Sequence, residues 1–405
     1  MKYIFKMKRT FILLLLSSFF AAGQSQTESL PKPTGIYFVG VTYLSFVDYN
    51  RKELFDNNQG KNREITVKAW YPSDIKSDFE PYLLNSESEF AVKYLQFPEI
   101  FRILKTNSSR DVPLSSKESK YPILIFSHGW GEHYSQNTVL MEEMASHGYI
   151  VFSLSHHYEC KFTSFPDGRF IYIDMNSQRL QKIMGEMRDP KALEVIQKFS
   201  TAGNDEERLQ VFADMEKVLP TGLTESSKYW AEDISFFIDQ LNGLNNENEF
   251  FKNKLNVNEI GVFGMSLGGF SSNEVSMLDN RVRACVNMDG GFHGLISKGE
   301  IKVPTMFLNS QRYLGYGNIF TNRSETDCYS FTVRNSDHMN FSDYSIYPVP
   351  AAEPLLGSIE GDKVIKIMNV MVLNFFDKYL KEKHNIDLIK KAELFSEIEI
   401  ATNIE

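Results

Sequence analysis

The stretch that decides the fold is Val257–Phe270, which reads V-N-E-I-G-V-F-G-M-S-L-G-G-F. An apolar run ends at Phe263, the motif G-M-S-L-G follows at residues 264–268, and a small-residue stretch suited to a helix comes next. A strand, a tight turn and a helix in succession are typical of a nucleophile elbow, in which flanking glycines avoid clashes around a strained serine. The sequence therefore predicts that Ser266 projects above a sheet as a nucleophile; a purely structural strand-to-helix turn is the alternative.

Upstream of the elbow, the sequence predicts two neighbouring parallel strands. Tyr121–Ser127 is a continuous apolar run, Thr138–His147 has a helical pattern that ends before Gly148, and Tyr149–Ser155 is a second apolar run. A strand, a helix and a strand in so few residues imply parallel pairing through a right-handed crossover.

The loop that follows the first of these strands reads H-G-W-G at residues 128–131. It lies at the carboxyl end of its strand, which is where open α/β sheets place their sites. Its glycines allow a main-chain amide to turn inward. We therefore expect the amides of Trp130 and of Leu267, the residue after the serine, to form an oxyanion hole.

The remaining segments complete an α/β-hydrolase fold, a mostly parallel central sheet flanked by helices. Gly35–Val47 and Arg63–Tyr71 predict an antiparallel hairpin at the N-terminal edge of the sheet. A helical insertion over the site is predicted at about residues 174–228. Its helical pieces are Gln178–Met187, Lys191–Phe199 and Glu206–Val218; a covering helix follows at Tyr229–Leu241, then strands at Arg283–Met288, Thr305–Leu308 and Tyr329–Val333, and a last helix at Lys363–Lys381.

A serine hydroxyl needs a histidine to accept its proton, and in this fold the histidine comes after the acid in the chain. Three histidines follow Ser266, namely His293, His338 and His384. His338 directly follows the last predicted strand, whereas His384 lies in a charged terminal segment and His293 stands just past Asp289. We therefore predict His338 as the base.

The histidine in turn needs a carboxylate to fix its tautomer. Asp289 stands at the end of the strand that follows the nucleophile helix, and the next strand ends in Asn309 and Ser310, which carry no carboxylate. Asp289 is therefore the predicted acid. Asp337 and Asp343 remain alternatives.

Residues 1–23 are typical of an export signal. Four basic residues precede the apolar run Phe11–Phe20, and Ala21, Ala22 and Gly23 offer a cleavage site. The run is too short to span a bilayer. We therefore predict an exported protein, periplasmic or secreted, with residues 24–405 as one hydrolase domain; an uncleaved anchor is the alternative.

Charge and cysteine content restrict the partners. The formal net charge of −9 would become −13 after loss of the signal, because four basic residues and no acidic ones are removed. An acidic surface argues against nucleic acid, which is bound largely through Lys and Arg. The three cysteines, Cys160, Cys285 and Cys328, allow at most one disulfide.

A possible metal motif occurs at His156–Cys160, H-H-Y-E-C, because these side-chain types bind zinc. The spacing matches none of the usual ligand patterns, and the segment ends a strand that faces the site. We therefore expect it to line the pocket, and we predict neither a metal nor another cofactor.

Taken together, these stretches resemble the platelet-activating factor acetylhydrolase family, of the plasma and intracellular type II kind, within the α/β-hydrolase superfamily. The likeness covers most of the chain after the signal. The matching stretches are F-S-H-G-W-G at Phe126–Gly131, A-S-H-G-Y-I-V at Ala145–Val151, G-M-S-L-G-G at Gly264–Gly269, N-M-D-G at Asn287–Gly290, L-N-S at Leu308–Ser310, R-N-S-D-H-M-N-F at Arg334–Phe341, the run at Gly35–Gly40 and W-Y-P from Trp70.

The resemblance implies a metal-independent serine esterase with Ser266 as nucleophile, Asp289 as acid and His338 as base, and with the Trp130 and Leu267 amides as the oxyanion hole. It implies a small-molecule or lipid ester as substrate, short acyl esters of phospholipids included, with transient contact at a membrane surface.

This sequence departs from the family pattern at two places. Met265 stands where a histidine is usual before the serine, and the helical segment before Tyr229 leaves the identity of the ester open. Two alternatives therefore stay open: a general or polyester-type esterase of the dienelactone hydrolase and cutinase neighbourhood, and a non-catalytic binding protein of the same fold.

Overall fold

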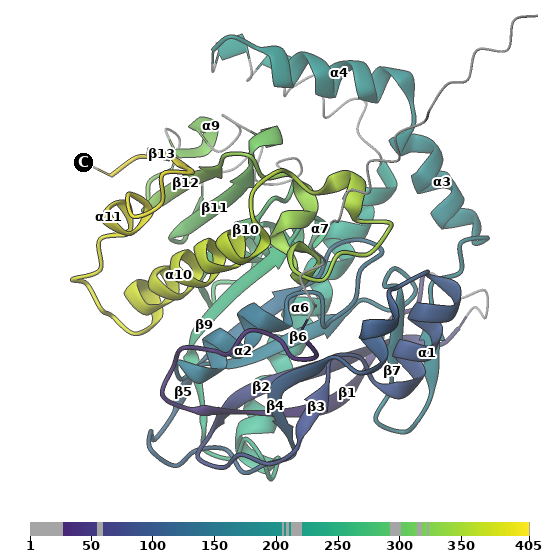
Figure 1. Ribbon diagram of the computed structural model, residues 1–405, viewed down its shortest axis with the longest axis vertical. Coiled ribbons are helices and arrows are strands. Elements are labelled where there is room, and N and C mark those ends of the chain that lie inside the picture. The colour runs from purple at the N-terminus through teal and green to yellow at the C-terminus, as the bar shows by residue number, and fades with distance from the viewer. Residues whose placement is uncertain are drawn as a thin grey trace, which may run out of the picture.

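The computed structural model describes residues 27–54, 60–204, 206–207, 210–211, 221–291, 301–313, 318–321 and 324–404. The predicted signal peptide and His293 lie outside these residues. An 11-stranded sheet forms the centre, in the order β13-β12-β11-β10-β9-β5-β6-β2-β1-β4-β3 (Figure 1). Within the described ranges, no helix is both long and apolar enough to cross a membrane.

Six neighbouring strands in the middle of the sheet are parallel. They are β12 (Cys328–Val333), β11 (Thr305–Ser310), β10 (Val282–Met288), β9 (Leu255–Met265), β5 (Tyr121–Ser127) and β6 (Ile150–Ser155). Every residue of β6, β11 and β12 is buried, as expected for strands that have helices on both faces. This arrangement confirms the predicted α/β fold.

The two faces of the sheet carry separate hydrophobic clusters. α2 (Thr138–Ser146) and α10 (Gly361–Leu380) lie in front of the sheet, and α6 (Thr221–Glu247) and α7 (Leu267–Leu278) lie behind it (Figure 1). Side chains alternate along β5, so Leu124 and Phe126 join the cluster of α2 and α10, while Ile123 and Ile125 join that of α6 and α7.

The predicted N-terminal hairpin is present, but it is not the edge of the sheet. β1 (Phe38–Lys52) and β2 (Asn62–Ser73) pair antiparallel, and two further strands, β4 (Lys105–Arg110) and β3 (Phe79–Pro81), lie outside them. β4 reads K-T-N-S-S-R, and its buried side chains are polar. One of these, the Ser108 hydroxyl, donates to the buried Glu142. Because its buried side chains are polar, β4 lacks the hydrophobic pattern from which a strand can be predicted.

Two other segments differ from the expectation. The helical pattern around Glu89–Leu104 predicts one helical piece there. The structure instead has α1 (Asn85–Tyr94) and the 3-10 turn η1 (Glu99–Arg102), with Pro98 between them, because proline disfavours continuation of a helix. At the other end, α11 (Leu388–Ala392) and β13 (Ile398–Thr402), which pairs antiparallel with β12, were not predicted.

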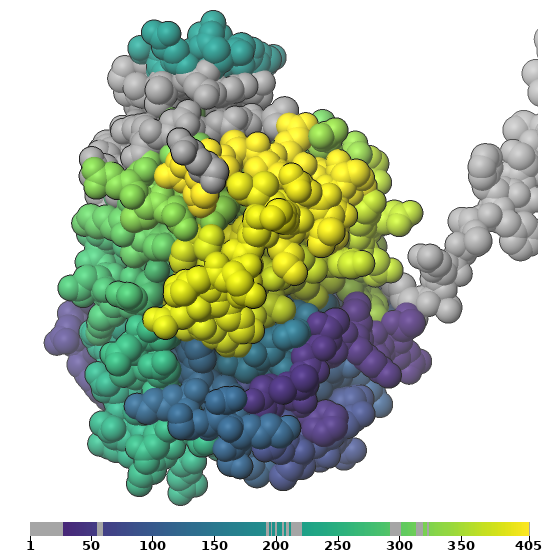
Figure 2. Space-filling view, turned by 90° about the vertical axis from the view of Figure 1, so that its left-hand side faces the viewer, coloured from purple at the N-terminus to yellow at the C-terminus, as the bar shows by residue number. Residues whose placement is uncertain are grey.

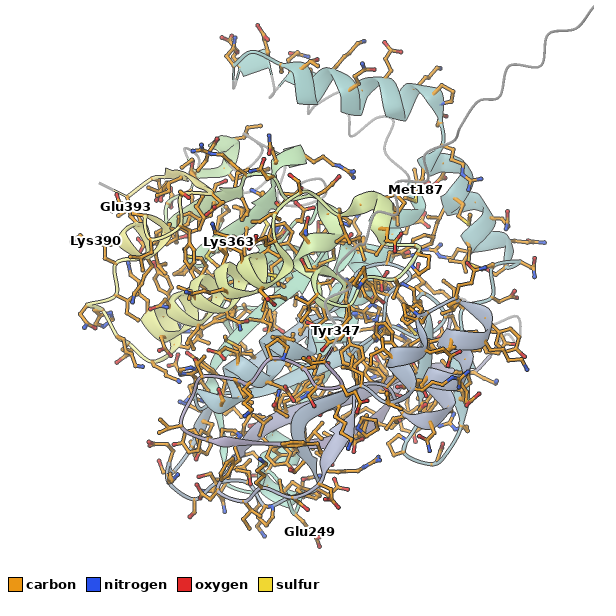
Figure 3. All side chains as sticks on the ribbon, in the orientation of Figure 1. Met187, Glu249, Tyr347, Lys363, Lys390 and Glu393 are labelled. Atoms are coloured by element: carbon orange, nitrogen blue, oxygen red, sulfur yellow. The ribbon has the colours of Figure 1, made fainter. Side chains whose placement is uncertain are left out.

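The region of the expected insertion contains α3 (Gln178–Met187) and α4 (Pro190–Thr201). α3 ends at Met187, and α4 lies above the sheet (Figures 1 and 3), where its Val195 packs against the hydrophobic cluster that includes Phe307 and Phe320. α6 is one helix that begins before the expected Tyr229, and most of the expected piece Glu206–Val218 lies outside the described residues. A small two-stranded sheet, β7 (Phe162–Ser164) and β8 (Phe170–Tyr172), precedes α3.

The C-terminal part closes the front of the molecule. In Figure 2 its surface, in yellow, lies between the N-terminal strands below and α4 at the top. On α10, Lys363 pairs with Glu397, which joins the helix to the segment that leads into β13.

Candidate active site

Ser266 occupies a strained turn between β9 and α7. Its backbone dihedral angles are φ 58° and ψ −123°, a region that residues with a Cβ rarely adopt. The Ser266 N–H donates to the Met288 carbonyl at 2.9 Å, and its own carbonyl accepts from Phe270 N–H at 3.1 Å. The strand and helix on either side thus hold the geometry of a nucleophile elbow.

The glycines of the motif are required by close approach. A Cβ on Gly264 would lie 2.3 Å from the Gly268 carbonyl carbon, and a Cβ on Gly268 would lie 2.0 Å from the carbonyl oxygen of Ser127 at the end of β5. Real Cβ atoms do not approach so closely. The motif therefore lets α7 pack directly against the strand that precedes it and the strand beside it.

The structure brings the three residues predicted as a relay together. His338 Nε2 lies 3.0 Å from Ser266 Oγ, and His338 Nδ1 lies 2.6 Å from Asp289 Oδ2. Asp289 follows β10, and His338 begins the 3-10 turn η3 (His338–Phe341) after β12. Because these strands are parallel, their carboxyl ends meet at one edge of the sheet, which places residues far apart in sequence side by side.

The environment of Asp289 fixes its orientation. Its side chain is fully buried, whereas that of His338 is 17% exposed. The second oxygen, Oδ1, accepts from the main-chain N–H of Ser310 at 2.6 Å. One carboxylate oxygen is thus held by β11 and the other faces the imidazole.

The alternative acids have other partners. Asp337 Oδ1 accepts from the His338 main-chain N–H at 2.7 Å, and its side chain pairs with Arg312 at 3.0 Å. Asp343 faces the first turn of α2, 3.4 Å from Val139 N, and burial raises the pKa of Asp343 well above its usual range. His384 is exposed in the terminal segment. In the described part of the chain, the carboxylate that reaches the His338 ring is that of Asp289.

The loop predicted to supply an oxyanion donor is fixed on both sides of Trp130. Gly129 N–H donates to Gln136 Oε1 at 2.9 Å, and Gly131 N–H donates to the Glu159 carbonyl at 2.8 Å. Among the described residues, neither the Trp130 amide nor the Leu267 amide has a protein acceptor. The Leu267 N–H lies in the first turn of α7, where main-chain N–H groups have no carbonyl acceptor within the helix.

A second polar network, which the sequence did not reveal, lies beneath this loop. Ser127 Oγ is 2.7 Å from His156 Nε2, and His156 Nδ1 is 2.8 Å from Asp233 Oδ2. Arg63 holds Asp233 through bonds of 3.1 and 2.6 Å. All four side chains are fully buried, so no substrate can reach this Ser-His-Asp arrangement. Burial lowers the pKa of His156 to about 4, so the ring is neutral at pH 7.

The motif His156–Cys160 was expected to line the pocket, but most of it is buried. Tyr158 is half-buried, and the other four side chains are buried. His157 bonds to Thr66, Cys160 to Thr163, and Glu159 to indole and hydroxyl groups. Within the described ranges, no group of three or more His, Cys, Asp or Glu side chains is arranged to hold a metal ion. All three cysteines are free and buried.

Comparison with known proteins identifies the family. A family model described as platelet-activating factor acetylhydrolase, isoform II, matches residues 22–394. Platelet-activating factor acetylhydrolase from Canis lupus familiaris is 27% identical over an alignment of 399 residues, and the match covers 92% of this chain and 82% of the relative. The protein of the same name from Bos taurus is 23% identical over 393 residues, again with 92% and 82% covered.

Solved structures show the same fold. A ferulic acid esterase from Streptomyces cinnamoneus superposes with a TM-score of 0.69 at 21% identity, covering 92% of this chain and 99% of that one. This likeness confirms the predicted α/β-hydrolase fold. Because the family model spans most of the sequence, the chain belongs to the platelet-activating factor acetylhydrolase isoform II family of ester hydrolases.

Proposed function

We propose that this protein is an exported serine esterase that cleaves short acyl esters through Ser266, Asp289 and His338. The observation that carries the proposal is the relay geometry, 3.0 Å from Ser266 Oγ to His338 Nε2 and 2.6 Å from His338 Nδ1 to Asp289 Oδ2. These are hydrogen-bond distances suited to proton transfer from a hydroxyl to an imidazole that a carboxylate orients.

In the proposed reaction, Ser266 Oγ attacks the ester carbonyl carbon while His338 Nε2 takes the hydroxyl proton. The tetrahedral intermediate then collapses, the bond to the alcohol oxygen breaks, and His338 returns the proton to that oxygen. Water, deprotonated by His338, hydrolyses the acyl-enzyme in the same manner. Asp289 remains ionised throughout and stabilises the imidazolium.

The intermediate carries a negative oxygen that needs donors. We assign this role to the Trp130 and Leu267 amides, which flank Ser266 and have no protein acceptor among the described residues. Loss of one such donor typically lowers turnover by about 10²–10³-fold.

The walls beside Ser266 support a short acyl group. Trp130, Leu267, Phe270 and Trp230 belong to one apolar cluster, which also includes Tyr158. The Trp130 ring projects from the oxyanion loop, so a long acyl chain would have to displace it. A larger alcohol, such as a lysophospholipid, would occupy the side under α3 and the start of α6. The names of the mammalian relatives favour the same substrate class.

Export is the second part of the proposal. It is supported by the basic, apolar and small-residue succession in residues 1–23. The protein isolated from its host should begin at Gln24, and N-terminal sequencing that finds Met1 retained would contradict this.

A ladder of nitrophenyl esters from acetyl to dodecanoyl tests the substrate class. The wild type should have its highest kcat/KM with short acyl groups. Trp130→Ala should shift the preference to longer chains and affect acetyl turnover less, because the main-chain donor survives the change. An optimum at long chains in the wild type would contradict the proposal, and absence of any turnover would favour the non-catalytic alternative.

A further inference from the structure

We propose that Glu159 is a positioning residue that fixes the acyl-side wall of the pocket by holding the Trp130 indole, an assignment that rests on the proposed function. The Glu159 side chain is fully buried. Three side-chain donors converge on it. Trp130 Nε1 donates to Oε1 at 3.1 Å, Ser226 Oγ donates to Oε1 at 2.6 Å, and Trp230 Nε1 donates to Oε2 at 2.8 Å.

The donors require Glu159 as an acceptor on both oxygens. Indole N–H groups can only donate, so each tryptophan needs a carboxylate oxygen. Ser226 Oγ itself accepts from Arg179 Nη2 at 3.2 Å, which places a cation behind the hydroxyl. An ionised carboxylate can accept from all of these donors. Burial of an acid is costly unless it is hydrogen-bonded, so a wall with packing alone as its role would not need Glu159.

Glu159 holds the oxyanion loop at two points. Its main-chain carbonyl accepts from Gly131 N–H at 2.8 Å. Its side chain accepts from the indole N–H of Trp130, which is next to Gly131 in the loop. The main-chain bond does not depend on the side chain. A substitution of the carboxylate should therefore release the indole and leave the Trp130 amide in place, which separates acyl selection from oxyanion stabilisation.

The other two donors join the insertion to the same point. Ser226 and Trp230 are on α6, and Arg179 is on α3. The Trp230 ring also stacks on His156, with ring centres 4.0 Å apart, so it has a second support. Trp130 is half-buried and packs against the apolar cluster that includes Leu267, the residue that follows Ser266. The Trp130 indole, which faces the pocket, therefore depends on Glu159 more than the Trp230 indole does.

The first experiment compares Glu159→Gln with Trp230→Phe on the ester ladder. The glutamine keeps the shape, but only its oxygen can accept a hydrogen bond. The oxygen should stay with the fully buried Trp230 N–H, because the half-buried Trp130 can be solvated and the Ser226 hydroxyl can donate to Gly222 O instead, so the NH2 group faces Trp130. We expect the ratio of octanoyl to acetyl kcat/KM to rise about tenfold, as for loss of one hydrogen bond to a charged group. Trp230→Phe, which retains stacking on His156, should change the ratio less than about twofold. A uniform loss on all esters in Glu159→Gln, or an equal shift in Trp230→Phe, would overturn the proposal.

Trp130→Phe keeps a ring without the N–H and gives a second variant should Glu159→Gln fold poorly. It should shift the ratio in the same direction, and the double variant should shift it no further, because both changes remove the same bond. Additive shifts would contradict the assignment.

Acrylamide quenching provides a readout that does not depend on catalysis. The chain has three tryptophans, and Trp70 and Trp230 are fully buried, so quenching reports mainly on the half-buried Trp130. Glu159→Gln should increase the quenching constant, and an unchanged constant would overturn the proposal. If quenching rises but the wild type cleaves no ester, the proposed function fails while the positioning of Trp130 by Glu159 stands.

Discussion

Asp289→Asn is expected to lower kcat by about 10⁴-fold, equivalent to about 5 kcal/mol of transition-state stabilisation. The reason is the pair of contacts that fixes this side chain. Oδ1 accepts from Ser310 N–H at 2.6 Å, and Oδ2 faces His338 Nδ1 at 2.6 Å. An asparagine has one acceptor and one donor group. Its oxygen must remain with the Ser310 amide, since the opposite orientation would bring two donors together.

The amide NH2 group would then face His338 Nδ1, which must become an acceptor. The ring proton moves to Nε2, the atom 3.0 Å from Ser266 Oγ, and that atom can no longer accept the hydroxyl proton. The side chain keeps its volume, so the fold should be unchanged. The defect is thus one of tautomer rather than of shape.

The assay is single-turnover acylation and steady-state hydrolysis of nitrophenyl acetate, with Asp337→Asn as the matched control. Asp337 adjoins the same histidine but pairs with the half-exposed Arg312, a surface contact worth about 0.2–1 kcal/mol of stability. Its loss should change turnover less than fivefold. A loss below about tenfold in Asp289→Asn, or a larger loss in Asp337→Asn, would refute the assignment of the acid.

Three further predictions concern packing, protonation and metals. Gly268→Ala should lower the free energy of unfolding in urea by about 1–3 kcal/mol, because the new Cβ would lie 2.0 Å from Ser127 O. Gly243→Ala in α6, which has open space around it, should be neutral or stabilising. Equal urea midpoints for the two variants would contradict this. Burial lowers the pKa of His156 to about 4, below the roughly 6.5 of an unfolded histidine, so the unfolded chain binds that proton more readily. The unfolding free energy should therefore be full above about pH 6.5 and fall toward pH 4, equally in wild type and in the exposed control His384→Gln, and a flat profile would be evidence against this. EDTA should leave ester turnover unchanged, and activity lost in EDTA and restored by a divalent ion would contradict a metal-free mechanism.

Much of the central fold could be predicted because its signals are local. β5 has the predicted bounds, Tyr121–Ser127, since a strand buried on both faces is a continuous apolar run. The elbow was visible because close packing demands glycine at two fixed positions around Ser266. The acid and the base could be assigned because Asp289 and His338 each follow a predicted strand closely. These features depend on residues near one another in the chain.

Other features depend on partners from distant segments and could not be predicted. β4 is a polar strand whose buried hydroxyls are satisfied by Glu142 of α2. Asp233 lies on an amphipathic helix, and only the fold shows that Arg63 pairs with its charge and that His156 forms a hydrogen bond with it. Glu159 was considered as a metal ligand, whereas its partners are two indoles and a hydroxyl. A buried polar group gives no signal in periodicity, because its stabilisation comes from tertiary contacts.

Mapping the adduct of a fluorophosphonate on the protein shows whether Ser266 is an activated nucleophile. The reagent reacts with a serine whose proton a neighbouring base removes, so we expect one adduct on the wild-type protein, on the peptide that contains Ser266. Ser266→Ala should carry no adduct while it retains the wild-type circular dichroism spectrum. An adduct on another serine, or a folded wild type that does not react, would contradict the role of Ser266 as nucleophile.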